Sequence, residues 1–140
     1  MAKASLVVLI SGSGSNLQAI IDAIKAGQLD AEISAVISNK ASAKGLERAA
    51  AENITTHVVD HKNYPNREMF DQALIDIIDP LHPDLVVLAG FMRILTEGFI
   101  KQYHHRLINI HPSLLPRYKG LHTHQQAIDN ADKIHGASVH

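Results

Sequence analysis

Short apolar segments without polar alternation recur along the chain and predict buried β-strands. They are rich in Val, Ile and Leu and stand at Leu6–Ile10, Ile33–Ile37, Leu85–Ala89 and Leu107–Ile110. Strands of this kind are typical of parallel sheets covered on both faces, because every side chain then meets apolar neighbours. The segments therefore predict one buried, mainly parallel sheet.

Segments with helical periodicity lie between the predicted strands. In the first, apolar residues at i, i+3, i+4 and i+7 run from Leu17 to Ile24. Ser15 and Gln18 have the spacing of a capping box at its start, and Gly27 marks its end.

Three further segments repeat this helical pattern with different strength. The strongest is Phe70–Ile78, which ends before Pro80, and weaker ones are Leu46–Ala50 and Leu121–Ile128. Strands that alternate with helices predict a doubly wound α/β fold, with helices on both faces of the sheet. We expect residues 1–140 to belong to a single domain, because no linker or repeat interrupts the pattern.

Composition excludes several classes of function. The chain contains no cysteine, which excludes disulfides, thiolate zinc sites and a cysteine nucleophile and fits a reducing cytoplasm. Its net charge is −1, and no Lys/Arg run indicates a nucleic-acid or membrane surface. No apolar run reaches the roughly 18 residues of a membrane span. We therefore expect a cytoplasmic protein that binds small molecules.

A loop rich in glycine and serine, Ser11–Asn16, joins the first strand to the first helix. Glycines let the backbone approach a ligand, and free N–H groups with the helix dipole favour an anion. The dinucleotide fingerprint fails because Leu17 stands where its last glycine belongs, and no Walker Lys-Ser/Thr pair follows. The loop suits a terminal phosphate on a small substrate. The alternative is a tight turn with a capping serine.

Asn109 and His111 stand at the end of the last apolar segment. An extended backbone places both side chains on one side of the carboxyl edge of the sheet. Histidine transfers protons near neutral pH, and an asparagine amide can donate a hydrogen bond to an oxyanion. This pair suits acyl transfer without a protein nucleophile, since Ser113 lacks the nucleophile elbow. The alternative is a hydrogen-bonded pair that only ends the strand.

Other polar residues near the predicted strand ends give weaker signals. Arg67, at the start of the third helix, either projects toward these strand ends or is a solvated helix residue. The stretch Met92–Leu95 is a connection from a strand to a helix with an apolar rim. His122 and His124 do not share a helix face and lack a third ligand, so we expect no metal site.

Taken together, the motifs resemble the phosphoribosylglycinamide formyltransferase family, the folate-dependent transformylases of purine biosynthesis. The resemblance runs from Leu6 to His140 and keeps the family order and spacing. It rests on VLISGSGSNLQAII, VISNK, GLERA, VVLAGFMRIL, LINIHPSLLP, GLHTHQQAI and HGASVH. Methionyl-tRNA formyltransferase and formyltetrahydrofolate deformylase share the Asn-x-His motif, but the phosphate loop and GLHTH resemble the glycinamide enzymes.

The resemblance implies a Rossmann-like formyltransferase fold and direct transfer of a formyl group from 10-formyltetrahydrofolate to the amine of glycinamide ribonucleotide. It implies that Gly14, Ser15 and Asn16 hold the substrate phosphate. The implied catalytic residues are Asn109, His111 and His140, with Asn109 and protonated His111 stabilising the oxyanion and no metal taking part. The implied folate pocket is lined by Arg67, Met92, Arg93, Ile94 and Leu95. The alternatives are a deformylase that transfers the formyl group to water, or a phosphate-binding module without catalysis.

The resemblance also implies a catalytic aspartate in the loop after the strand that ends at His140, and this chain stops before it. We therefore expect a fragment truncated at its C-terminus, which keeps the phosphate cradle but has little or no transformylase activity. Truncation at a strand also predicts association or instability, because a sheet edge is left unpaired. A turnover assay beside an extended version checks the first expectation, and equal rates would contradict it. Sedimentation checks the second.

Overall fold

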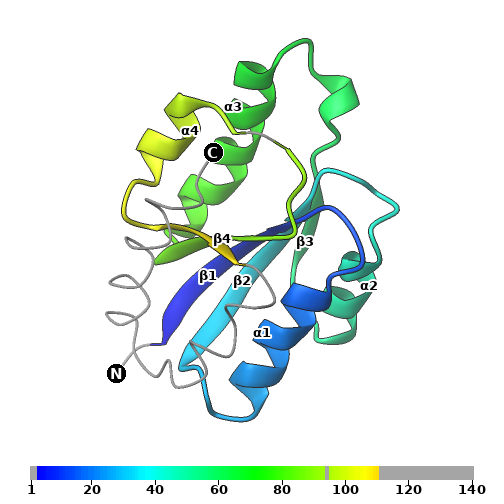
Figure 1. Cartoon of the computed structure of the whole chain (residues 1–140), viewed down its shortest axis with the longest axis vertical. Helices are drawn as coiled ribbons and strands as arrows, with labels where there is room; N and C mark the ends of the chain where they lie inside the picture. Colours follow the sequence, from blue (N-terminus) through cyan, green and yellow to red (C-terminus); the bar gives the residue numbers. More distant parts are fainter. Residues whose placement is uncertain (1–2, 94, 111–140) are drawn as a thin grey trace.

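A five-stranded parallel sheet forms the centre of the molecule (Figure 1). The computed structural model describes residues 3–93 and 95–110. The strands, in the spatial order β3-β2-β1-β4-β5, are β1 (Ala4–Ile10), β2 (Ala31–Ser38), β3 (Thr56–Val58), β4 (Leu85–Ala89) and β5 (Leu107–Ile110). The predicted α/β fold with a parallel sheet is confirmed. The predicted helix at Leu121–Ile128 lies outside the described residues.

Helices cover both faces of the sheet (Figure 1). The helices α1 (Ser15–Lys25) and α2 (Lys44–Ala51) pack on one face, and α3 (Arg67–Ile78) and α4 (Glu97–Gln102) pack on the other. The central strand β1 contributes side chains to the cores on both faces of the sheet, because successive side chains point to opposite faces. Leu6, Val8 and Ile10 of β1 join the core under α1, whereas Val7 and Leu9 join the core under α3. This explains why the strand reads as a continuous apolar run.

The sequence located the ends of the helices well, with one error. Gly27, with φ +77°, follows α1, and Pro80 lies in the short 3-10 turn η2 (Asp79–Leu81) that ends α3, as predicted. The predicted capping box at Ser15 is wrong. The N-cap of α1 is Gly14, in the left-handed region and without a side-chain cap, and Ser15 is the first helical residue. The side chain of Gln18 donates to Asp22 instead.

Two short elements lie outside the predicted segments. β3 is an edge strand of largely exposed residues that pairs with Val36–Ser38 of β2, and it lacks the apolar pattern of the other strands. α4 follows the Met92–Leu95 connection and is capped by Thr96, whose Oγ1 accepts a hydrogen bond from Phe99 N at 3.3 Å. A 3-10 turn, η1 (His61–Asn63), lies in the connection between β3 and α3.

A tyrosine fixes α4 against the end of α3. The fully buried Tyr103 donates from its hydroxyl to Asp79 Oδ1 at 2.7 Å, and Gln102 donates to the same carboxylate. Burial, and then the hydrogen bond to Asp79, hold the pKa of the Tyr103 hydroxyl well above its usual range. The hydroxyl therefore stays protonated as a donor, and this contact stabilises the helical layer.

The first loop and α2 approach each other more closely than side chains would allow. A Cβ on Gly14 would lie 2.5 Å from Gly45 Cα, and a Cβ on Gly45 would lie 2.4 Å from Ile10 Cδ1. Gly14 also has φ +77°, a conformation that costs other residues about 1–2 kcal/mol. Gly14 is therefore required for this contact, whereas a Cβ on Gly45 would lie 3.1 Å from Gly14 Cα and would mainly displace the end of the Ile10 side chain.

We predict that Gly14→Ala lowers the free energy of unfolding by about 2–4 kcal/mol, because overpacking adds to the cost of the left-handed backbone. Gly27→Ala is the matched control, since Gly27 has the same φ of +77° but nothing within 4 Å of an added Cβ. It should cost only about 1 kcal/mol. Urea unfolding measures both variants, and equal losses would show that the contact with Gly45 is unimportant.

Candidate functional site

The carboxyl edge of the sheet contains a crevice at the point where the topology reverses. From β1 the chain passes to α1 on one face, and from β4 it passes to α4 on the other, so the loops after these strands diverge. A cavity of about 290 Å³ opens between these loops. Its lining consists of Ser11, Gly12, Ser13, Gly14, Ser15, Asn16, Lys40, Ala89, Gly90 and Met92.

α2 holds the loop that forms one wall of this cavity. Gly45 N donates to Gly12 O at 3.1 Å, and Arg48 Nε donates to Ser13 O at 2.7 Å. Two carbonyl oxygens of the loop are thereby engaged by α2.

The N-terminus of α1 provides the electrostatic character of the cavity. Gly14 is buried, Asn16 is half-buried and Ser15 is exposed, and the first turn contains no acidic residue. The N–H groups of a first helical turn lack partners within the helix and carry the positive end of its dipole. The three predicted phosphate-binding residues thus lie together at a helix terminus suited to an anion.

Lys40 is a lining residue that the sequence analysis missed. It follows the end of β2, and its backbone is held by Ser38, whose Oγ accepts from Lys40 N at 3.0 Å and donates to Lys40 O. Among the described residues that line the cavity, it is the one with a cationic side chain. Its position directly after a strand was a usable signal, because in parallel sheets such residues meet at one edge.

A hydrogen bond brings the first loop to the end of β5. Asn16 Nδ2 donates to Ile110 O at 3.4 Å, across 94 residues of sequence. Asn109, the preceding residue, is half-buried and pairs in register with Leu88 of β4. The residues of the first loop and Asn109 therefore lie at the same sheet edge. His111 and His140 lie outside the described residues.

The stretch predicted to line the folate pocket lies beside the start of α3. Met92 is 76% exposed, whereas the Leu95 side chain is buried in the core. Leu95 could therefore line a folate pocket only with its backbone. The guanidinium carbon of the half-buried Arg93 lies 5.8 Å from the centroid of the Phe70 ring. Arg67, exposed at the first position of α3, precedes Phe70 by about one helical turn. Ile94 lies outside the described residues.

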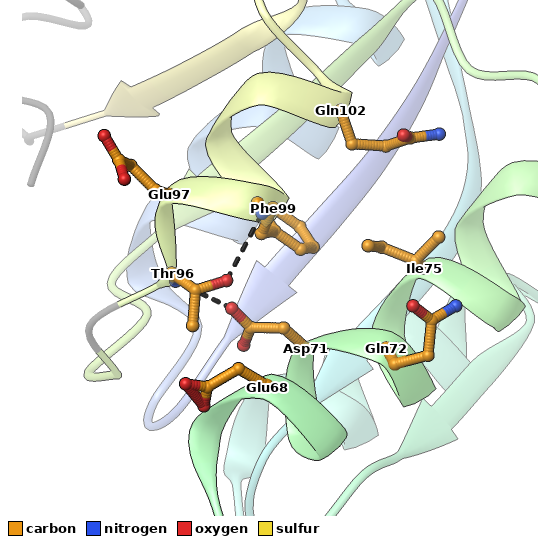
Figure 2. A pocket seen from close by; sticks show the side chains of 9 residues that line it. Glu68, Asp71, Gln72, Ile75, Thr96, Glu97, Phe99 and Gln102 are labelled. Carbon is orange, nitrogen blue, oxygen red and sulfur yellow. Dashed lines mark hydrogen bonds between the residues drawn. The ribbon is translucent and has the colours of Figure 1, made fainter.

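A larger cavity, of about 500 Å³, lies between α3 and α4 (Figure 2). Asp71, which lines it, accepts a hydrogen bond from Thr96 N at 2.7 Å, and Glu68 and Glu97 also contribute carboxylates. The Glu97 carboxylate points away from Asp71 (Figure 2). Within residues 3–93 and 95–110, no three His, Cys, Asp or Glu residues are grouped to hold a metal. The acidic lining disfavours an anion, so the smaller cavity is the candidate site.

None of the helices in the described part of the chain has the length and apolar character needed to cross a membrane.

Sequence comparison places the chain among formyl transferases. A family model described as formyl transferase matches residues 4–140. Phosphoribosylglycinamide formyltransferase of Escherichia coli (strain K12) is 57% identical over 136 residues, which are 97% of this chain and 64% of that protein. The human trifunctional purine biosynthetic protein adenosine-3 is 46% identical over 138 residues, and 14% of its length is covered. The chain thus spans about two thirds or less of these relatives.

Solved structures show the same arrangement. The phosphoribosylglycinamide formyltransferase of Coxiella burnetii superposes with a TM-score of 0.76 at 52% identity, covering 91% of this chain and 60% of that one. The corresponding protein of Brucella melitensis gives a TM-score of 0.75 at 47% identity, covering 91% of this chain and 67% of that one.

We predict that Lys40→Gln weakens binding of inorganic phosphate about two- to fivefold, the range expected for one exposed charge pair. The effect should shrink as ionic strength rises, because salt screens exposed charges. Calorimetric titration at low and high salt measures both quantities. Lys101→Gln, an exposed lysine on α4, is the control and should leave phosphate binding unchanged. Equal losses in both variants would exclude a specific role for Lys40.

Proposed function

Because the chain belongs to the formyl transferase family, we propose that it forms part of a phosphoribosylglycinamide formyltransferase. The reaction is transfer of the formyl group of 10-formyltetrahydrofolate to the amine of glycinamide ribonucleotide, in purine biosynthesis. The observation that carries the proposal is the 290 Å³ cavity at the reversal point of the sheet. It has a helix N-terminus on one side, and its Asn16 is hydrogen-bonded to the end of β5, the strand that carries Asn109. Residues 1–140 act as one domain in the proposal, and the absence of cysteine fits its cytoplasmic location.

The phosphate of glycinamide ribonucleotide is assigned to the cradle of Gly14, Ser15 and Asn16. This assignment is supported by the first turn of α1, which presents backbone N–H groups and contains no acidic residue. Lys40, which also lines the cavity, adds a positive charge. A substrate anchored there extends along the carboxyl edge of the sheet toward β5, because Asn16 is hydrogen-bonded to Ile110.

The formyl transfer step is assigned to Asn109 and His111, with His140 close to them. The amine nitrogen of glycinamide ribonucleotide attacks the formyl carbon, and the carbonyl oxygen becomes an oxyanion. The Asn109 amide donates a hydrogen bond to this oxyanion, as does protonated His111. Collapse of the intermediate breaks the bond from the formyl carbon to the folate nitrogen. Protonated His111 gives its proton to that nitrogen, and the proton lost by the amine then restores the protonated imidazole.

The folate is assigned to the other side of the crevice, along Met92, Arg93, Ile94 and Leu95 with Arg67 nearby. The loop after β4 supports this assignment, because it forms the wall of the cavity that faces the phosphate loop. An arginine at the start of α3 adds positive charge for the carboxylates of a folate tail. Both substrates then meet between the ends of β1, β4 and β5, near Asn109.

We predict that Asn109→Ala lowers kcat by about 10²–10³, the loss typical of one oxyanion donor. The assay measures formyl transfer from 10-formyltetrahydrofolate, with and without glycinamide ribonucleotide, in a version of the protein carried to the length of the matched relatives. Asn109→Asp keeps the shape of the side chain but replaces the amide donor by a carboxylate, so it should lose activity to a similar extent.

The KM for glycinamide ribonucleotide should change little in both variants, since the phosphate cradle is untouched. Unaltered turnover in Asn109→Ala would remove Asn109 from the reaction. Release of formate at the same rate without the amine would instead establish a deformylase.

A further inference from the structure

The hydroxyl of Ser11 links three loops of the sheet edge. Ser11 is 4% exposed and directly follows β1. Its Oγ donates to Asn39 Oδ1 at 2.6 Å and accepts from Met92 N at 2.7 Å. The single hydroxyl proton is used by the bond to Asn39, so an oxygen lone pair remains for the Met92 amide. The partners lie 28 and 81 residues away in the sequence.

Two of these loops belong to the proposed phosphate side of the candidate site and the third to the proposed folate side. Ser11 opens the loop that leads to Gly14, and Asn39 precedes Lys40, so these two residues belong to the phosphate side. Met92 opens the stretch assigned to the folate. Asn39 is 2% exposed, and a buried hydrogen bond of this kind is costly to break because its groups are removed from water.

Two hydrogen bonds from side chains hold the backbone at the two ends of the Met92–Leu95 stretch. Ser11 binds the backbone N–H of Met92 at its beginning, and Asp71 binds the N–H of Thr96 just after its end. The first of these contacts leads to the phosphate loop, whereas the second leads to α3. A change in the phosphate loop can therefore reach the folate side through one hydroxyl group.

We propose that Ser11 is a positioning residue that couples the two substrate sites, an inference that rests on the proposed function. Glycinamide ribonucleotide bound at Gly14–Asn16 restricts the loop that begins at Ser11. The Ser11 hydroxyl transmits this restriction to Met92 N and fixes the backbone against which the folate binds. By linkage, each substrate then raises the affinity for the other by the same factor.

Amide hydrogen exchange of the labelled chain, followed by NMR with and without saturating glycinamide ribonucleotide, tests this coupling. The amide of Ser15 reports binding itself, and the amide of Met92 reports transmission to the folate side. We expect binding to slow Met92 exchange by about fivefold or more, the lower range of coupling between sites. Ser11→Ala should abolish the slowing while Ser15 still responds.

Ser5→Ala is the matched control, because it removes a hydroxyl of β1, the strand that leads to Ser11, and this hydroxyl is hydrogen-bonded to Ser34. The slowing at Met92 should persist in this variant. Ser11→Cys, which has a similar shape and only weak hydrogen bonding, replaces Ser11→Ala if the alanine variant does not fold.

The outcomes separate this inference from the proposed function. Equal slowing at Met92 with and without the Ser11 hydroxyl would mean that the ligand contacts Met92 directly, and would overturn the coupling. A response at Ser15 without slowing at Met92 in the unmodified chain would also overturn it. No response at Ser15 in the unmodified chain would contradict the proposed phosphate cradle itself.

Discussion

The close contact between Gly14 and Gly45 determines where the first loop can run. The Cβ that Gly14 lacks would lie 2.5 Å from Gly45 Cα, so the loop and α2 are in backbone contact. That proximity allows Gly45 N and Arg48 to bind the carbonyls of Gly12 and Ser13. The direction in which the start of α1 faces the cavity follows from these contacts.

The buried polar side chains stabilise the loops of the candidate site rather than the apolar core. Among the described residues, the buried polar side chains are Ser11, Ser38, Asn39 and Asp71. Each of them binds a segment that follows the carboxyl end of a strand, whether the phosphate loop, the turn after β2 or the stretch before α4. The apolar sheet supplies stability, and these hydrogen bonds fix the loops that carry the proposed chemistry.

The sequence was a good guide wherever apolar periodicity determines structure. The bounds of β4 and β5 agree with the apolar segments, and the helix ends at Gly27 and Pro80 follow local rules. The errors arose where tertiary contacts decide. The capping box failed because the approach to α2 requires glycine at the N-cap, and β3 was missed because an exposed edge strand need not be apolar.

The candidate site was predictable to a similar degree. The position of Gly14, Ser15 and Asn16 follows from one loop, and Asn109 lies in the predicted strand at the same edge. Lys40 could have been found from its position after β2, whereas the contacts of Ser11 join residues far apart in the sequence, so no local pattern could indicate them. Leu95 matched a motif assigned to the pocket, yet its side chain packs in the core.

The central position of β1 has a consequence for synthesis on the ribosome. One edge of β1 pairs with β2, which follows soon after it, but the other edge pairs with β4, where Leu6 lies beside Leu85. The backbone N–H of Ser5 likewise donates to the Asp84 carboxylate, which comes 79 residues later in the sequence. Until β4 emerges, the strand from which the first loop extends has an open edge of unpaired backbone N–H and C=O groups between apolar side chains. The nascent chain must therefore be protected from association during that interval.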